Sequence, residues 1–514
     1  MEVIAVSNNN YYGAIVVTVQ GLDLLIVNLK TLKPIERVHK ELLVGDSIYQ
    51  HQPIDFELVN QMTGALRGFL QLMNDYEIES YQLWGSEALS HAINADFIRD
   101  QIFLRTGLHL SWLSISEENY YRNQAVLLDL RHNKTNENGL IHLIGINSGN
   151  TTITQFSGRS FVYSSNFSLG PVRIAEDLQS LRQSAPNSVE VLNDYIESKL
   201  TNFARITPHE AISGPSEVIL LGTMPLSHLV SNENKTRMSI KEFEKLFDQA
   251  IDASDQFLME QYNLKENEMP LLLPELLLLR RLLRLTQGTS VVFSDTTVLD
   301  GLAVNESIKA GFSKLDFTEQ TVTDAQNIAN HYQVEPVHRQ LVTKFALHLF
   351  DQLKPLHQLG DRERLLLQIA CILHDVGAYV DAHEHYFHSE YIIQHSNIIG
   401  LSTKERDIIA AISRYHSTQT PSADLSRFRQ LPTEDRLLIA KLAAILRLAD
   451  ALDDDRQQKI KRISVSLKAP EVIITAYCNE SLLFEKWAFA FKSRFFEETF
   501  GLKPQLKQRS VTAK

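Results

Sequence analysis

The sequence is poor in cysteine and has no long uninterrupted apolar run, and both shortages limit what the protein can be. Two cysteines, Cys371 and Cys478, cannot build a disulfide framework, which favours a reducing compartment such as the cytoplasm. The first residues lack the basic and then apolar pattern of a signal peptide. The most apolar stretch, MPLLLPELLLLRRLLRL, is interrupted by Pro274, Glu275 and arginines, so we expect a buried helix and no membrane span.

Basic residues are also fewer than acidic ones. Lys and Arg number 50 against 62 Asp and Glu, which gives a formal net charge of −12. Such a chain is not expected to bind nucleic acid broadly, and an anionic substrate must be met by a local positive site. The 514 residues are 44% hydrophobic and 22% charged, which is typical of a globular protein with several domains.

The first third of the sequence predicts strands, and their order occurs twice. A strand, a loop rich in Asn, Ser or Gly, a strand, a tight turn and a strand recur about 137 residues apart. The first copy comprises Val3–Val6, the loop 7–10, Ala14–Gln20 and Leu24–Leu29, and the second comprises Leu140–Ile146, the loop 147–150, Thr151–Phe156 and Ser160–Phe167. Helical stretches follow each copy, which favours an α/β fold with two related lobes and a cleft. Polar loops between strands are also common in α/β proteins without such a duplication.

From about residue 320 the pattern is almost entirely helical, and strands return near the end. We therefore predict four domains: lobe I at 1–135, lobe II at 136–315, an all-α domain at 316–460 and a small α+β domain at 461–514.

Histidines are concentrated in the helical region. Ten of the 18 lie between His331 and His416, about a sixth of the chain. Imidazoles and carboxylates suit Mn²⁺, Fe, Zn²⁺ or Ni²⁺, and carboxylates with water suit Mg²⁺. The pair His374–Asp375 ends an apolar run, and a carboxylate beside a histidine there can bridge two metals that clamp a phosphate and activate water. A histidine on an apolar helix face is, however, more often a core residue, and the role of His385 stays open.

The order of these residues resembles the HD superfamily of metal-dependent phosphohydrolases, over residues 338–450. The resemblance implies two metal sites that share Asp375. The first would comprise His338, His374, Asp375 and Asp450, and the second His388 and His416.

A wider resemblance covers nearly the whole chain. The stretches ILHDVG, HEHYFHSEYIIQHSNIIGLS and RYHS resemble the helical third domain of the Ppx/GppA family, the exopolyphosphatases and guanosine pentaphosphate phosphohydrolases. WLSISEEN, NFSLGPVRIAEDL and TTVLDGLAV resemble segments of its first half. The resemblance implies two actin-like lobes of the sugar-kinase type, a divalent metal (Mg or Mn first), a homodimer, and polyphosphate or pppGpp/ppGpp as the ligand.

The N-terminal half departs from the family where the family has phosphate loops. Ala5, Gly145 and Thr152 stand in place of its acidic residues, which position Mg²⁺ and water. Of the acidic set only Glu117 and Glu118 remain, and Glu118 matches the catalytic base. The residues left to bind phosphate are Asn9, Asn10, Ser148, Gly149, Asn150, Thr151 and Arg173.

Three hypotheses follow. The first is a phosphohydrolase that uses Glu118 as a general base, the metal centre, or both. The second is a catalytically impaired homologue that binds polyphosphate or an alarmone and regulates a partner. An actin-like sugar or acetate kinase is a weaker third, because no nucleotide-phosphate acid is recognisable. Scattered basic residues, among them Arg456 and Lys459–Arg462, would line a channel for a phosphate chain or simply the wet faces of helices.

Overall fold

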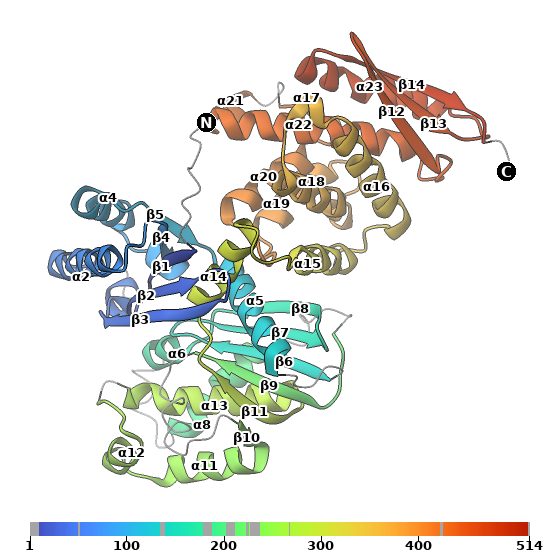
Figure 1. Ribbon diagram of the computed structural model, residues 1–514. Coiled ribbons are helices and arrows are strands. Elements are labelled where there is room, and N and C mark those ends of the chain that lie inside the picture. The colour runs from blue at the N-terminus through green and yellow to red at the C-terminus, as the bar shows by residue number, and fades with distance from the viewer. Residues whose placement is uncertain are drawn as a thin grey trace. The chain divides into compact units, whose positions relative to one another are not determined.

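The computed structural model describes residues 10–49, 52–133, 139–177, 188–201, 211–222, 226, 237–266, 268–421 and 425–511. The chain forms two compact units, Met1–Gln320 and Thr321–Lys514 (Figure 1). The four domains with boundaries after residues 135, 315 and 460 stay a prediction. None of the helices in the described part of the chain combines the length and the apolar composition needed to span a bilayer.

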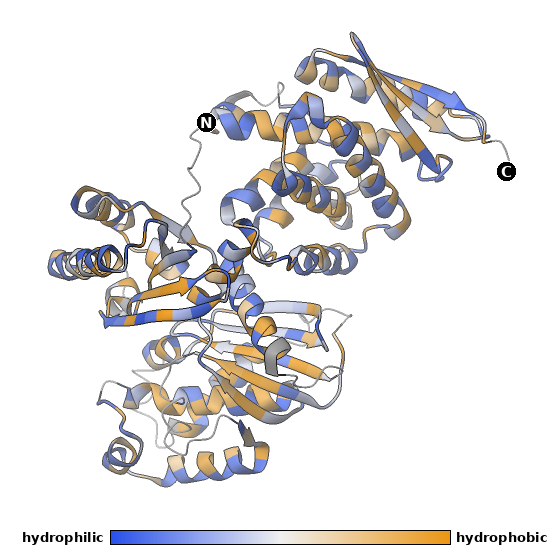
Figure 2. Cartoon of the chain, in the orientation of Figure 1, coloured by the Kyte–Doolittle hydropathy of each residue, from blue (hydrophilic) through white to orange (hydrophobic). Residues whose placement is uncertain are grey.

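A five-stranded sheet organises the first part of the N-terminal unit. Its strands lie in the order β3-β2-β1-β4-β5, and β1 pairs antiparallel with β2 and parallel with β4. They comprise β1 (Tyr11–Val17), β2 (Gly21–Asn28), β3 (Lys33–Glu41), β4 (Tyr81–Ser86) and β5 (Leu110–Leu113). The associated helices are α1 (Gly45–Tyr49), α2 (Phe56–Asp75), α3 (Glu87–Ser90), α4 (Ala95–Thr106) and α5 (Ile115–Asn133). β1 and β2 are apolar on both faces (Figure 2) because α2 and α4 cover one face and a later helix covers the other.

A second sheet repeats this arrangement. Its order is β10-β11-β9-β6-β7-β8, so that, apart from the edge strand β10, the strands β6, β7 and β8 take the places of β1, β2 and β3. Its strands are β6 (Leu140–Ile146), β7 (Thr151–Ser157), β8 (Ser160–Phe167), β9 (Ser216–Leu221), β10 (Arg237–Ser239) and β11 (Gly288–Ser294). Its helices are α6 (Pro171–Asp177), α8 (Ser188–Leu200), α11 (Ile240–Asp252), α12 (Asp255–Tyr262) and the largely buried α13 (Met269–Leu285).

The duplication is thus present, but the first copy begins later than the sequence pattern indicated. The strand that matches β6 is β1, and its following turn lies at residues 18–20, where the N–H of Thr18 donates to the carbonyl of Gly21 at 2.8 Å. The predicted loop at 7–10 is therefore not the counterpart of the loop at 147–150. The predicted strand Val3–Val6 lies outside the described residues.

Helix α14 (Val298–Lys309) returns to the first sheet. Its Val298, Leu299 and Leu302 share a core with β1 and β2, although the sequence analysis placed this segment in lobe II. The contact with α5 is very close, because a Cβ atom on Gly301 would lie 1.9 Å from the carbonyl oxygen of Tyr121. Only glycine fits at this crossing.

The C-terminal unit is a helical bundle with a small sheet. Its helices are α15 (Thr318–His331), α16 (Pro336–Gln352), α17 (Lys354–His357), α18 (Asp361–Leu373), α19 (His385–Gln394), α20 (Thr403–Arg414), α21 (Leu425–Arg429), α22 (Thr433–Asp450), α23 (Leu483–Phe500) and the 3-10 turns η1 (Val376–Tyr379) and η2 (Ala451–Asp453). The sheet has the order β12-β13-β14, with β12 (Arg462–Lys468), β13 (Glu471–Tyr477) and β14 (Lys503–Arg509). Apolar side chains of this sheet and of α23 belong to the same core as the bundle.

A buried carboxylic acid in this core predicts a pH-dependent stability. Burial raises the pKa of Asp324 to about 7, although the N–H of Ile399 donates to its Oδ2 at 2.8 Å. The folded state therefore keeps a proton that the unfolded state has lost, so stability falls as the pH rises from about 4 to about 7. The Asp324→Asn variant has no such proton to lose. We therefore expect its free energy of unfolding, measured with denaturant, to rise relative to that of the wild type by roughly 2 kcal/mol as the pH goes from 5 to 8. Parallel pH profiles of the two proteins would contradict this.

Candidate metal centre and phosphate-binding loops

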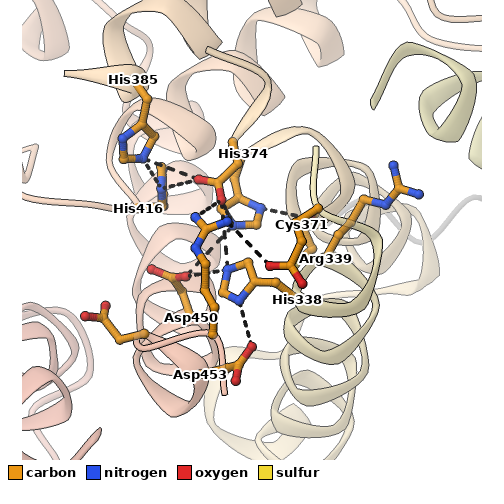
Figure 3. Close-up of polar contacts among 12 residues, drawn as sticks. His338, Arg339, Cys371, His374, His385, His416, Asp450 and Asp453 are labelled. Atoms are coloured by element: carbon orange, nitrogen blue, oxygen red, sulfur yellow. Dashed lines mark hydrogen bonds and ion pairs between the residues drawn. The ribbon is translucent and has the colours of Figure 1, made fainter. Parts of the chain in front are cut away.

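Five predicted metal ligands lie at helix ends in the C-terminal unit. His338 is in the first turn of α16, His374 and Asp375 follow directly after α18, and Asp450 is the last residue of α22. His416 lies just beyond the end of α20. All five are buried. The apolar sequences of these helices draw their ends into the core, and the polar side chains there meet one another (Figure 3).

Four of these residues surround one point. Nε2 of His338 lies 3.3 Å from Oδ1 of Asp450 and 3.9 Å from Oδ2 of Asp375. Nε2 of His374 lies 3.6 Å from Oδ2 of Asp375 and 3.9 Å from Oδ1 of Asp450. His338, His374 and Asp450 can each offer one ligand atom within 4.8 Å of the others. Two imidazoles and two carboxylates are therefore close enough to share one ion.

The second carboxylate oxygen of Asp375 faces another pair of histidines. Its Oδ1 lies 3.4 Å from Nε2 of His385 and 3.6 Å from Nε2 of His416, and the two imidazole nitrogens are 3.1 Å apart. His374, Asp375 and His416 form a second group that could hold an ion. Asp375 thus presents Oδ2 to His338 and His374 and Oδ1 to His385 and His416, as a bridging carboxylate does.

The other ring nitrogen of each buried histidine is held by the protein. Nδ1 of His338 lies 2.8 Å from Oδ2 of Asp453, and Nδ1 of His374 lies 2.7 Å from the carbonyl oxygen of Cys371. Nδ1 of His416 contacts the carbonyl of Ser413 in the same way. When the imidazole is neutral, a hydrogen bond donated from Nδ1 leaves Nε2 as the ligand atom that faces the centre, which is how proteins orient metal-binding histidines.

The pKa values of several titratable groups in the centre are strongly shifted. Burial lowers the pKa of His374 to about 4, so its imidazole is neutral near pH 7. Burial lowers the pKa of His338 as well, but the carboxylates of Asp450 and Asp453 outweigh it and raise the pKa to about 9. For Asp375 burial acts in the opposite direction to the neighbouring imidazoles, which hold the pKa of this carboxyl well below its usual range. The centre therefore holds ionised carboxylates in the interior.

His388 is not where the sequence analysis placed it. Among the described residues, no carboxylate lies within the 4.0 Å ion-pair limit of its ring, and His385 takes the position beside Asp375 and His416. Both histidines lie on α19, three residues apart. The sequence HEHYFHSEYII places two of its histidines on α19, and the approach of this helix to η1 decides which of them reaches the centre.

The two acidic residues predicted in the N-terminal unit, Glu117 and Glu118, lie in different environments. Glu117 is committed to the start of α5, because its Oε2 accepts from the N–H and the hydroxyl of Ser114 at 2.9 Å each. Glu118 is partly buried, and its desolvation raises the pKa of its carboxyl while the charge of Arg122, 3.9 Å away, opposes the shift. Arg122 also donates to Oδ1 of Asn147 at 3.1 Å, which brings Glu118 near the loop after β6.

Polar groups in and next to the loop from Asn147 to Asn150 already have hydrogen-bond partners within the protein. The hydroxyl of Thr151 donates to the carbonyl of Leu169 at 2.6 Å, and the side-chain amide of Asn150 donates to Oδ1 of Asn166 at 2.7 Å. The carbonyl of Ser148 accepts from the N–H of Val172 at 3.0 Å, and so occupies the start of α6. Gly149 lies in the same turn, and Arg173 is exposed in the first turn of α6.

The first loop contributes a residue that the sequence analysis missed. Nε2 of Gln20, in the turn after β1, donates to Oγ of Ser148 at 3.0 Å. Asn10 precedes β1, and a seven-residue strand, about 23 Å long, separates it from that turn. The grouping of Asn10 with Ser148 was therefore wrong, because the sequence pattern had been aligned one strand too early. Asn9 lies outside the described residues.

Comparison with known proteins identifies the helical part. Residues 320–507 match the family model described as Ppx/GppA phosphatase, domain III. This part of the chain is a Ppx/GppA domain III. The family predicted from the sequence is thereby confirmed, and it is a family of phosphatases, which supports a phosphohydrolase at the level of the family.

Solved structures of Ppx/GppA proteins resemble the chain as well. A family member from Aquifex aeolicus shares 15% identity, covers 59% of this chain and 99% of its own, and superposes with a TM-score of 0.50. An exopolyphosphatase from Cytophaga hutchinsonii shares 13% identity over 58% of this chain and 98% of its own, with a TM-score of 0.47. The first likeness shows the fold. The predicted fold class, two actin-like α/β lobes and a helical C-terminal region, is confirmed.

A pocket in domain III opens onto the metal centre. It has a volume of about 410 Å³, and its lining includes Asp375, Arg456, Tyr332 and Tyr379. The guanidinium of Arg456 donates to Oδ2 of Asp375 at 2.6 Å and is half exposed. On the other side of the centre the ammonium of Lys492 contacts Oδ2 of Asp450. Two basic side chains thus balance the buried carboxylates.

Proposed function

We propose that this protein is a metal-dependent phosphohydrolase of the exopolyphosphatase and guanosine pentaphosphate phosphohydrolase class, with its chemistry in the C-terminal unit. The observation that supports this is the position of Asp375, which offers one carboxylate oxygen to each of two histidine groups. The ligand chemistry fits a divalent ion, because Nε2 of His374 is buried and has no hydrogen-bond partner among the described residues.

In this proposal His338, His374 and Asp450 hold one ion together with Oδ2 of Asp375. His385 and His416 hold a second ion together with Oδ1. Imidazole-rich sites suit Mn, Fe, Zn or Ni better than Mg. A divalent ion in such a site polarises a phosphoryl group and makes water a better nucleophile.

Arg456 is the residue that we propose to receive the substrate. Its guanidinium lies at the pocket wall beside Asp375, where it can form charge-assisted hydrogen bonds with a phosphate. The substrate is polyphosphate or a guanosine penta- or tetraphosphate, whose bridging bonds are phosphoanhydrides. The proposed location is the cytoplasm, in keeping with two buried free cysteines. The proposed assembly is a homodimer, as the family resemblance implies.

The N-terminal loops take a secondary role in this proposal. Gly145 and Thr152 supply no carboxylate beside the loop, where the resemblance implies acids that position a metal. Ser148, Asn150 and Thr151 are already hydrogen-bonded to the protein or its turns. The second candidate function rests on this observation: a homologue that binds a phosphate chain or an alarmone in the cleft and regulates without rapid hydrolysis.

Metal content separates the two functions. We expect protein purified without chelator to carry one or two transition-metal ions per chain by elemental analysis, and to release phosphate from polyphosphate or pppGpp. His374→Ala removes a buried ligand and should lose both the metal and the phosphate release. His388→Ala removes a histidine of α19 outside the centre and should keep both. A metal-free wild type that binds polyphosphate without turnover would instead support the regulatory homologue.

A further inference from the structure

The small sheet of the C-terminal unit has two very different faces. On β13 the side chains of Val472, Ile474 and Ala476 are buried and pack in the core with α23. The alternate residues Glu471, Ile473, Thr475 and Tyr477 point to the opposite side and are partly exposed. Helix α23 packs against the inner face of the sheet and not against this outer face (Figure 1).

The edge strands place positive charges on the outer face. The register pairs Tyr477 with Arg462 on β12 and with Arg509 on β14, and it pairs Thr475 with Lys507. At the other end Glu471 lies between Lys468 and Lys503. All five cations are exposed, and none has a carboxylate within the 4.0 Å ion-pair limit among the described residues. Glu471 is the one acid of this face, and it accepts from the amide of Gln505.

The middle strand adds a flat and partly apolar centre. The guanidinium of Arg462 lies over the ring of Tyr477, 4.0 Å from its centroid. A hydrogen bond with Ser464 lowers the pKa of Tyr477, and the charges of Arg462 and Arg509 act in the same direction. Ile473, two pairs further along the strand, continues the apolar strip.

We infer that this face binds a single-stranded nucleic acid. Positive edges can follow the phosphates of a flexible strand, and an aromatic and apolar centre can stack its bases, which is how single-strand binding surfaces are built. A phosphate chain without bases would use the edges but gain nothing from Tyr477 and Ile473. The net charge of −12 spoke against nucleic-acid binding by the chain as a whole, but it averages over a face with five cations and one acid.

Binding can be measured on the full chain with a fluorescein-labelled 12-nucleotide oligo(U) RNA, by anisotropy in the presence of EDTA. The chelator keeps the result independent of the proposed metal centre. We expect the double variant Lys507→Gln/Arg509→Gln to weaken binding at least tenfold at 50 mM salt. The slope of log K against log salt should become shallower by about 1.4, since each lost phosphate contact on a single strand contributes roughly 0.7. Tyr477→Ala should weaken binding at least fivefold, and Tyr477→Phe should retain it.

The matched control is Lys486→Gln/Arg494→Gln, which removes the same charge from α23 and should bind like the wild type. Thermal unfolding of each variant shows that its fold is intact. The inference is wrong if the wild type does not bind at 50 mM salt, or if the control loses as much affinity as Lys507→Gln/Arg509→Gln. It is also wrong if Tyr477→Ala binds RNA like the wild type, and competition by inorganic polyphosphate would then identify a site for a phosphate chain alone.

Discussion

Replacing Asp375 by alanine is expected to reduce phosphate release from polyphosphate and pppGpp by roughly 10³-fold or more. Both histidine groups face this one carboxylate, with His374 at 3.6 Å from Oδ2 and His385 at 3.4 Å from Oδ1. Its removal therefore weakens both proposed ion sites at once. It also removes one of the two carboxylates that the half-exposed Arg456 contacts at the pocket wall, the other being that of Glu335. A group on which a whole catalytic assembly depends has effects of this size.

Glu118→Gln is the comparison that locates the chemistry. If hydrolysis takes place in the C-terminal unit, this variant should release phosphate within a few-fold of the wild-type rate. The measurement is initial phosphate release at saturating substrate, with Mn²⁺ or Mg²⁺ added. A large loss in Glu118→Gln together with wild-type activity in Asp375→Ala would move the chemistry to the N-terminal unit. Metal analysis of both variants distinguishes a lost ligand from a lost base.

The order of ligands in the sequence predicted most of the centre, for a physical reason. His338, His374, Asp375 and Asp450 stand at the ends of strongly apolar helices, so burial of those helices brings their ends together. The pattern could not choose between His385 and His388, because both lie on the exposed-to-buried boundary of α19. Which side of α19 meets Asp375 depends on the close approach of Gly377 in η1 to the backbone of α19.

In the N-terminal unit the sequence pattern predicted the strands of the second copy well and those of the first copy only in part. Strands β6, β7 and β8 lie almost where the sequence predicted, because polar loops mark their ends clearly. In the first copy the turn at residues 18–20 carries valine and threonine and gives no such mark, so the asparagines at 8–10 were taken for it. The return of α14 to the first sheet depends on a long-range contact at Gly301, which local periodicity cannot reveal.

The close approach that selects His385 leads to the second large effect. A Cβ atom on Gly377 would lie 2.0 Å from the carbonyl oxygen of His385 and 2.3 Å from the backbone N of Ser389. Ser389 links the same two segments, because its hydroxyl donates to the carbonyl of His374 at 2.6 Å and accepts from the N–H of Gly377 at 2.9 Å. Backbone atoms cannot turn aside as a flexible side chain can, so a methyl group here must push α19 away from η1.

Gly377→Ala is therefore expected to destabilise the protein by about 3 kcal/mol or more and to lower its metal content. The ion held by His385 and His416 should be lost first, because α19 carries His385. Denaturant unfolding and elemental analysis measure the two effects. Gly64→Ala is the matched control, since Gly64 lies inside α2 with open space around the new methyl group, and alanine there should stabilise by up to about 1 kcal/mol. Equal metal content in the two variants would mean that the contact at Gly377 does not hold His385 at the centre.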